Sequence, residues 1–270
     1  IGGVLATNGI REIAFMTIMN DTVKENMTCI DLGSNIGYTT LLMLNNVGDG
    51  GMVYGIEPDP HNMDILKKNI DVNNFHNRCE LSQAAISNYD GELSFWMAEN
   101  GPNLSSVQKT KHSTKEIVVP SYTLNTFLKD RKYPNFIKMD IEGHEVQVFE
   151  GGLDYFDKNH EGDTNILLEV HPQFYNEEND FGKMVREYYK LGFKPKYTVS
   201  TPIYRPDLFV EAGYEPIQEI PTDGYHRAIY DNISEDDLIR FACEEHHQTF
   251  QGSRVSKKIV RSFMLTREAK

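Results

Sequence analysis

The stretch Asp31-Leu32-Gly33-Ser34-Asn35-Ile36-Gly37 constrains the fold of this chain more than any other. It follows a short apolar run at residues 27–32 and precedes a stretch of helical spacing at residues 38–46. A turn between a strand and a helix is where open α/β sheets bind ligands. Gly33 permits a tight turn and close approach of a ligand to the backbone, and Gly37 allows helix and strand to pack closely. The stretch therefore predicts a ligand-binding α/β fold.

Short apolar strand patterns alternate with helical patterns through the first two thirds of the chain, which predicts a parallel sheet with crossover helices. A helix is expected after Asp59, which can cap it, with Pro60 in its first turn. Residues 201–227 hold four prolines without a clean period and are not assigned. No linker divides the 270 residues, so we expect a single domain over residues 1–270. Strands are predicted at residues 27–32, 52–56, 80–86, 92–96, 116–119, 136–140, 166–170 and 259–265.

Composition excludes several classes of protein. The formal charge of −13 repels phosphate backbones, so nucleic acid is not an expected partner. There is no apolar run of eighteen residues, so no membrane partner is expected either. Cys29, Cys79 and Cys243 lie far apart and indicate neither a disulfide framework nor a thiolate zinc site. The start, Ile1-Gly2-Gly3-Val4, lacks the basic region of a signal peptide, and we expect a cytoplasmic protein.

A second acid, Glu57, ends the next predicted strand, 20 residues after Gly37. An acid at this place can accept hydrogen bonds from both hydroxyls of an adenosine ribose. A dehydrogenase would need the pattern G-x-G-x-x-G, and Asn35 occupies the place of its middle glycine, which leaves less room for a pyrophosphate. The acid at Asp31 also suits a cofactor that carries an ammonium and a sulfonium better than one that carries phosphates.

Further motifs follow in a fixed order along the chain. They are Ile56-Glu57-Pro58, Ala84-Ala85-Ile86, Ile137-Lys138-Met139-Asp140-Ile141-Glu142-Gly143 and Leu168-Glu169-Val170-His171. Together with Asp31–Tyr38 they resemble the FkbM family of S-adenosylmethionine (SAM)-dependent methyltransferases over about residues 27–172. The K-x-D-x-E-G stretch is the motif that distinguishes this family from other SAM enzymes.

The resemblance implies a Rossmann-like class I SAM-methyltransferase fold, with a mostly parallel seven-stranded sheet, an antiparallel last strand and helices on both faces. It implies SAM as cofactor. Residues 27–172 would form the SAM-binding and catalytic core, and residues 200–230 an insertion or lid on the substrate side. The implied cofactor contacts are Asp31, Gly33, Asn35 and Gly37 at the methionine part, Glu57 at the ribose, Gln83 and Ala84 at the adenine, and Asp140 beside the methyl group or the methionine amine.

The candidate catalytic residues are Asp140, Glu142, His144 and His171. Carboxylates and an imidazole just after a buried strand are unfavourable to place together without a use. Methylation of an alcohol needs a base, and the ordinary pKa of histidine lies near neutral pH. We slightly favour His144, and the alternative is that His144 only begins a helix while a carboxylate accepts the proton. The four residues could converge on a metal, but their spacing matches no recognised ligand set, so no metal is predicted.

The predicted function is therefore SAM-dependent methylation of a hydroxyl on a small molecule or saccharide. Oxygen is preferred over nitrogen through the family resemblance alone. Two alternatives stay open: a SAM-binding module without catalysis, serving as a sensor or scaffold, and an NAD-dependent oxidoreductase, which Asn35 argues against. The acceptor and the oligomeric state are not specified by the sequence.

Overall fold

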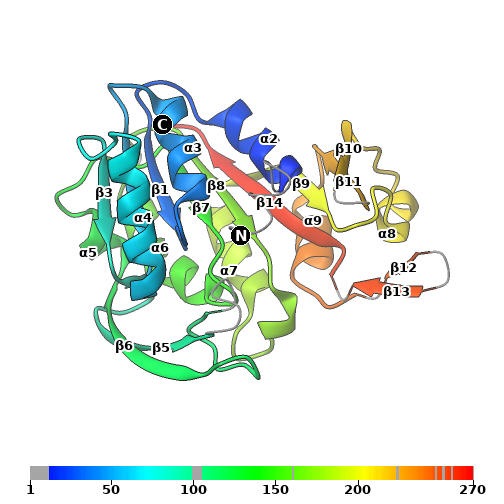
Figure 1. Ribbon diagram of the computed structural model, residues 1–270. Helices are drawn as coiled ribbons and strands as arrows, with labels where there is room; N and C mark the ends of the chain where they lie inside the picture. The colour runs from blue at the N-terminus through cyan, green and yellow to red at the C-terminus, as the bar shows by residue number, and fades with distance from the viewer. Residues whose placement is uncertain are drawn as a thin grey trace. The chain divides into compact units, whose positions relative to one another are not determined.

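The computed structural model describes residues 12–98, 105–159, 161–222, 225–246, 248–250, 253–256 and 258–269 (Figure 1). The start Ile1-Gly2-Gly3-Val4 lies outside these residues. The chain forms two compact units. We call Asn20–Asn165 the N-terminal unit and Ile166–Arg267, to which the described residues before Asn20 also belong, the C-terminal unit, and each is described by itself. The single domain expected from the sequence stays a prediction.

The N-terminal unit is built on four parallel strands in the order β7-β1-β2-β3. These are β1 (Thr28–Leu32), β2 (Met52–Ile56), β3 (Cys79–Ser82) and β7 (Phe136–Met139). All residues of β1 and β7 are buried, as expected for parallel strands covered on both faces. Because the strands are parallel, their carboxyl ends share one edge, and the acids that end or follow them are brought to that edge.

Helices cover both faces of these strands. They are α3 (Tyr38–Val47), α4 (Pro60–Val72), α5 (Leu124–Leu128) and α6 (Glu145–Lys158). Neighbouring residues of a strand point to opposite faces. In β2 the Tyr54 ring packs edge-on against Phe127 of α5, with centroids 6.2 Å apart. On the other face, a Cβ atom on Gly55 would lie 3.7 Å from Thr40 of α3. The α/β class with a large, mostly parallel sheet is confirmed.

The start of α4 follows the sequence pattern. The Asp59 carboxylate accepts hydrogen bonds from the amides of His61 and Asn62, and Pro60 occupies the first helical position. This cap fixes where the helix begins, one residue beyond the buried Asp59 and three beyond Glu57.

One predicted strand, at residues 80–86, is wrong as a single element. The structure ends β3 at Ser82 and places β4 (Ala85–Ile86) in a separate sheet of order β4-β6-β5. The amide of Ala84 donates to the carbonyl of Ser82 over 3.1 Å, which closes a tight turn, and Ala85 then pairs with Ser121. The other two strands of this small sheet, β5 (Gly91–Met97) and β6 (Lys115–Tyr122), confirm the predictions at 92–96 and 116–119.

The C-terminal unit has strands in the order β8-β14-β9-β11-β10. Strand β14 is antiparallel to β9, as expected for the last strand. The β10–β11 hairpin lies in the segment that the sequence left unassigned and adds to the strands that the resemblance implied. The strands are β8 (Thr164–Glu169), β9 (Lys194–Ser200), β10 (Gln218–Thr222), β11 (Tyr225–Tyr230), β12 (Gln248–Phe250), β13 (Ser253–Ser256) and β14 (Val260–Arg267). The remaining helices are α2 (Ile13–Thr22), η2 (Pro172–Phe174), α7 (Phe181–Lys190), α8 (Asp207–Glu211) and α9 (Glu235–Ala242).

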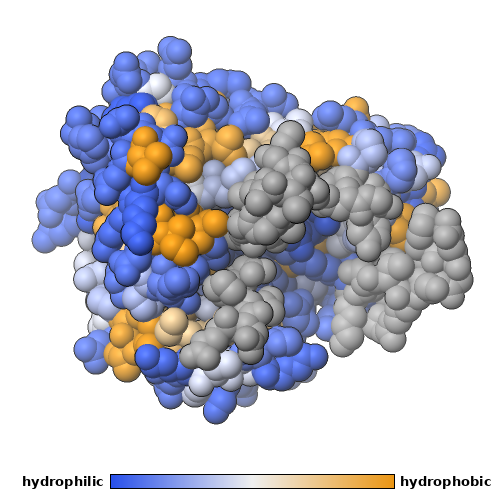
Figure 2. All heavy atoms as spheres, in the orientation of Figure 1, coloured by the Kyte–Doolittle hydropathy of each residue, from blue (hydrophilic) through white to orange (hydrophobic). Residues whose placement is uncertain are grey.

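Figure 2 shows a mostly hydrophilic face on which the apolar side chains gather in small separate patches. Exposed apolar residues such as Val72 on α4 and Val118 on β6 are ordinary for a protein surface. None of the helices in the described part of the chain is long and apolar enough to cross a membrane.

Candidate cofactor and catalytic site

The loop between β1 and α3 folds back onto β2. The amides of Gly33 and Ser34 both donate to the carbonyl of Ile56, over 3.0 Å each. Gly33, Asn35 and Gly37 all have positive φ angles, of 75°, 52° and 96°. Asparagine tolerates this left-handed conformation better than most residues, which explains how Asn35 can occupy the place of a glycine.

The two glycines are also required by packing. A Cβ atom on Gly33 would lie 2.1 Å from the carbonyl oxygen of Asp140, and one on Gly37 would lie 2.5 Å from the Leu66 side chain of α4. The close neighbours are therefore the end of β7 and the α4 helix. The loop and the residue that follows β7 form one packed unit.

Asp31 lies beneath this loop and is fully buried. Its Oδ2 atom accepts hydrogen bonds from the hydroxyls of Thr39, at 2.8 Å, and Thr40, at 2.6 Å. Its Oδ1 atom lies 3.0 Å from Nζ of Lys138. A buried carboxylate held by a cation and two hydroxyls is satisfied by the protein itself. A direct contact of Asp31 with the cofactor stays a prediction.

Glu57 follows β2 and is 4% exposed. Its Oε2 atom accepts the amide of Asn35 at 2.7 Å, and its Oε1 atom accepts the amide of Asp59 at 2.9 Å. Burial raises the pKa of Glu57 to about 7; the two amides lower it, and the Asp59 carboxylate raises it. A carboxylate offers about four acceptor positions, so the two amides leave room for a further donor such as a ribose hydroxyl.

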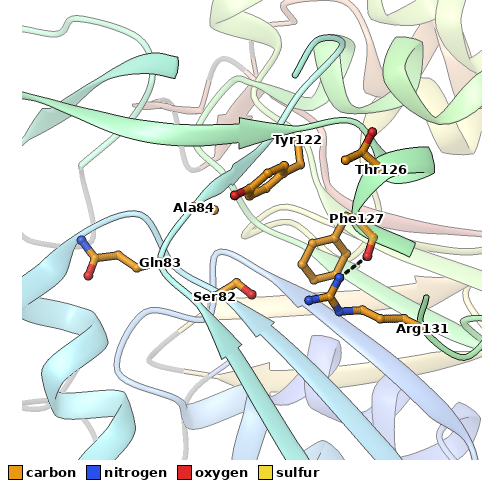
Figure 3. A pocket seen from close by; sticks show the side chains of 7 residues that line it. All are labelled: Ser82, Gln83, Ala84, Tyr122, Thr126, Phe127 and Arg131. Atoms are coloured by element: carbon orange, nitrogen blue, oxygen red, sulfur yellow. Dashed lines mark hydrogen bonds between the residues drawn. The ribbon is translucent and has the colours of Figure 1, made fainter. Parts of the chain in front are cut away.

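Gln83 and Ala84 both line a pocket of about 390 Å³ (Figure 3). Tyr122, Phe127 and Arg131 lie on the opposite side of the pocket from Gln83, whose side chain points away from them. The Arg131 guanidinium lies over the Phe127 ring, 4.2 Å from its centroid. The amide of Glu57 donates to the carbonyl of Ser82 over 3.2 Å, so the backbone of Glu57 contacts a residue that lines the pocket. The pocket is lined by Ser82, Gln83, Ala84, Tyr122, Thr126, Phe127 and Arg131.

The turn after β7 has an unusual backbone. Glu142 has φ 51° and Gly143 has φ 98°, so a non-glycine residue takes the left-handed conformation. This costs about 1–2 kcal/mol for an L-residue. The Glu142 carbonyl accepts the Ser106 hydroxyl at 2.7 Å, which helps to hold it there. Strain of this kind is characteristic of functional turns.

His144 begins α6, as the alternative interpretation of the sequence expected. It is 4% exposed, and its Nε2 atom lies 3.0 Å from the Ser87 hydroxyl. Its Nδ1 atom has no hydrogen-bond partner among the described residues. Burial lowers the pKa of His144 to about 4, although the nearby Glu145 raises it. A group with this pKa is a weak base near neutral pH, so the imidazole has no advantage over a carboxylate, whose ordinary pKa is also about 4.

His171 belongs to the C-terminal unit, whereas the other predicted site residues belong to the N-terminal unit. Its Nε2 atom lies 3.7 Å from Oε1 of Glu169. Burial raises the pKa of Glu169, but Arg261 and Lys258, at 2.5 and 2.9 Å from that oxygen, bring it to about 2. Two cations on this carboxylate disfavour its use as a metal ligand.

The sequence patterns indicated no role for Lys138, Ser105 or Ser106. Lys138 stands in an apolar strand, and that pattern predicts a buried and paired cation. Ser105 donates to the Asp59 carboxylate at 3.3 Å, and Ser106 to the Glu142 carbonyl. No local pattern marks the two serines, because their partners lie far away in the sequence.

These residues fit SAM. Glu57 has room for a further donor such as a ribose hydroxyl, and its backbone contacts a residue that lines the pocket. The fold and the site together point to a SAM-dependent methyltransferase.

Sequence comparison gives the family. The family model described as "Methyltransferase FkbM domain" matches residues 31–195, and the chain belongs to this family. Enzymes of the family transfer methyl groups from SAM, so SAM is the cofactor. No curated protein matches the chain.

Solved structures of methyltransferases are similar to this chain at low identity. The FkbM methyltransferase of Methylobacillus flagellatus is 15% identical with a TM-score of 0.44, and the match covers 76% of this chain and 43% of that one. An O-methyltransferase of Bacillus cereus is 12% identical with a TM-score of 0.42, over 100% and 86% of the two chains. A precorrin-6Y C5,15-methyltransferase of Geobacter metallireducens is 8% identical with a TM-score of 0.45, over 96% and 91%.

Proposed function

We propose that this protein methylates a hydroxyl oxygen of a small molecule or a saccharide. The observation that carries the proposal is the packing of Asp140 on the Asp31–Gly37 loop, which we call the cofactor loop. Its amide donates to the Leu32 carbonyl over 3.2 Å, and its own carbonyl lies against Gly33. This packing holds the acidic turn Asp140–Glu142 beside the proposed methionine site, where a base must act on the acceptor.

SAM supplies an electrophilic methyl group on a sulfonium. As the oxygen–methyl bond forms and the sulfur–methyl bond breaks, the hydroxyl proton passes to a base and S-adenosylhomocysteine is the other product. The base must lie within about 3 Å of the hydroxyl. We propose Asp140 or Glu142 for this role rather than His144, because His144 is buried with its Nε2 atom against Ser87, whereas the two acids are half-buried and more accessible to an acceptor.

The same proposal includes the setting and the cofactor contacts. Cys29, Cys79 and Cys243 are all free, which supports a reducing, cytoplasmic environment. Glu57 would hold the ribose, the Asp31–Gly37 loop the methionine part, and Gln83 and Ala84 the adenine. Residues 200–230 would contribute to acceptor binding, and this last role rests on the family resemblance.

The test uses SAM labelled in its methyl group and two acceptor panels, one of hydroxylated small molecules and saccharides and one of amines. We expect label in alkali-stable methyl ethers from the first panel. Once an acceptor is found, Asp140→Asn or Glu142→Gln should lower the rate about a hundredfold while SAM affinity changes little. Asp154→Asn, at an exposed position of α6, is the control. Label only in amines would refute O-methylation, and SAM binding without any labelled product would favour the binding module.

A further inference from the structure

Lys138 is a buried cation in the middle of the site's framework. Its side chain is 5% exposed, in a strand whose other residues are Phe136, Ile137 and Met139. Lysine is almost never buried unless it is paired. Its Cα atom is the register partner of Asp31 across β1 and β7, so the two side chains leave the sheet on the same face.

The ammonium of Lys138 has more than one acceptor. Nζ lies 3.0 Å from Oδ1 of Asp31, 2.8 Å from the carbonyl oxygen of Gly33 and 3.3 Å from that of Leu32. These three contacts match the three N–H donors of an ammonium. Two of the three acceptors, the carbonyl oxygens of Leu32 and Gly33, are backbone atoms of the cofactor loop, and only the third belongs to the Asp31 side chain.

The Gly33 residue is thereby held from both sides. Its amide donates to the Ile56 carbonyl of β2 over 3.0 Å, and its carbonyl accepts Lys138 of β7. Further along the loop, the Asn35 amide donates to Glu57. The direction of the first peptide groups of the loop is therefore set by two neighbouring strands.

We propose that Lys138 is a positioning residue for SAM, which fixes the carbonyls of Leu32 and Gly33 so that the loop presents its backbone to the methionine part of the cofactor. The inference rests on the proposed placement of the methionine part at this loop. It gives the lysine of K-x-D-x-E-G a role distinct from neutralising the buried Asp31. If Lys138 served only to neutralise Asp31, SAM binding would no longer need it once Asp31 is replaced.

That difference defines the experiment. SAM dissociation constants are measured by calorimetry, and melting temperatures by thermal unfolding, for the parent, Asp31→Asn, Lys138→Met and the double variant. On the Asp31→Asn background, Lys138→Met removes a buried charge that has lost the Asp31 carboxylate, so the melting temperature should rise or stay unchanged. SAM affinity should nevertheless fall about tenfold, because two loop carbonyls lose a charged donor. Lys158→Met, at an exposed position, is the control and should change neither value.

A SAM dissociation constant that Lys138→Met leaves unchanged on the Asp31→Asn background overturns the proposal, because neutralisation then explains the lysine fully. If the Asp31→Asn chains do not fold, Lys138→Arg is used, since it keeps the charge but arranges its donors in a plane. Its affinity for SAM relative to 5′-methylthioadenosine, which lacks the amino-acid part, should fall about fivefold through the weakened loop contacts. A parental ratio overturns the proposal. If methylthioadenosine binds to the parent as tightly as SAM, the placement of the methionine part fails as well.

Discussion

SAM binding should depend on pH through Glu57. Burial raises the pKa of Glu57 to about 7 in the free protein. The ribose hydroxyls are donors and favour the ionised carboxylate, so binding should return the pKa toward its ordinary value of 4.5. At pH 6 about nine tenths of the free protein carries a protonated Glu57, and at pH 8 about one tenth does. SAM affinity should therefore rise with pH over this range.

The size of this pH effect on SAM affinity follows from the raised pKa of Glu57. Removing the Glu57 proton at pH 6 costs about 1.4 kcal/mol, so SAM should bind about tenfold more weakly at pH 6 than at pH 8. Glu57→Gln keeps the shape but cannot ionise, and this dependence should disappear. At pH 8 the variant should bind about ten- to a hundredfold more weakly than the parent, because a charged acceptor is lost.

Calorimetry at pH 6, 7 and 8 in two buffers of different ionisation enthalpy measures both the affinity and the proton released on binding. The amino group of SAM also titrates near pH 8, so the compared quantity is the difference between the parent and Glu57→Gln. Glu116→Gln, at an exposed position of β6, should keep the parental pH dependence. If the parent and Glu57→Gln show the same pH dependence, the assignment of Glu57 to the ribose is refuted.

Two further predictions concern the framework of the site. Gly33→Ala should destabilise the protein by several kcal/mol and weaken SAM binding, because its Cβ atom would lie 2.1 Å from the Asp140 carbonyl in a left-handed conformation. Gly213 has φ +81°, and a Cβ atom there would have no neighbour within 4 Å. Gly213→Ala should therefore lower the free energy of unfolding, measured by urea denaturation, by only about 1 kcal/mol. Equal losses of stability in the two variants would contradict the clash at Gly33. His144 has a folded pKa of about 4, below its ordinary 6.5, so its contribution to stability should be lost as the pH falls from 6.5 to 4. His144→Gln should lose less stability over that range than the parent or an exposed-site control, His61→Gln, and identical losses would show that His144 does not titrate as described.

The acids at the strand ends could be predicted because their signal is local. Asp31, Glu57 and Asp140 each end or follow a short apolar run, and parallel strands bring such positions to one edge of a sheet. The family motifs added the cofactor and the placement of Gln83 and Ala84. The use of these residues in SAM binding stays a prediction, while the strands that contain or precede the three acids are confirmed.

What the sequence could not predict depends on distant contacts. The weak basicity of His144 comes from burial against Ser87, which is 57 positions away in the chain. The break between β3 and β4 has no glycine or proline to mark it, because a backbone bond from Ala84 to Ser82 makes the turn. The contacts of Lys138 with Leu32 and Gly33 join strands more than 100 residues apart.

The most direct test of the account is a crystal structure of the protein with S-adenosylhomocysteine. We expect both ribose hydroxyls within hydrogen-bond distance of the Glu57 carboxylate and the amino-acid part against the Asp31–Gly37 loop. A ligand that binds with its ribose away from Glu57, or with its amino-acid part away from this loop, would contradict the account.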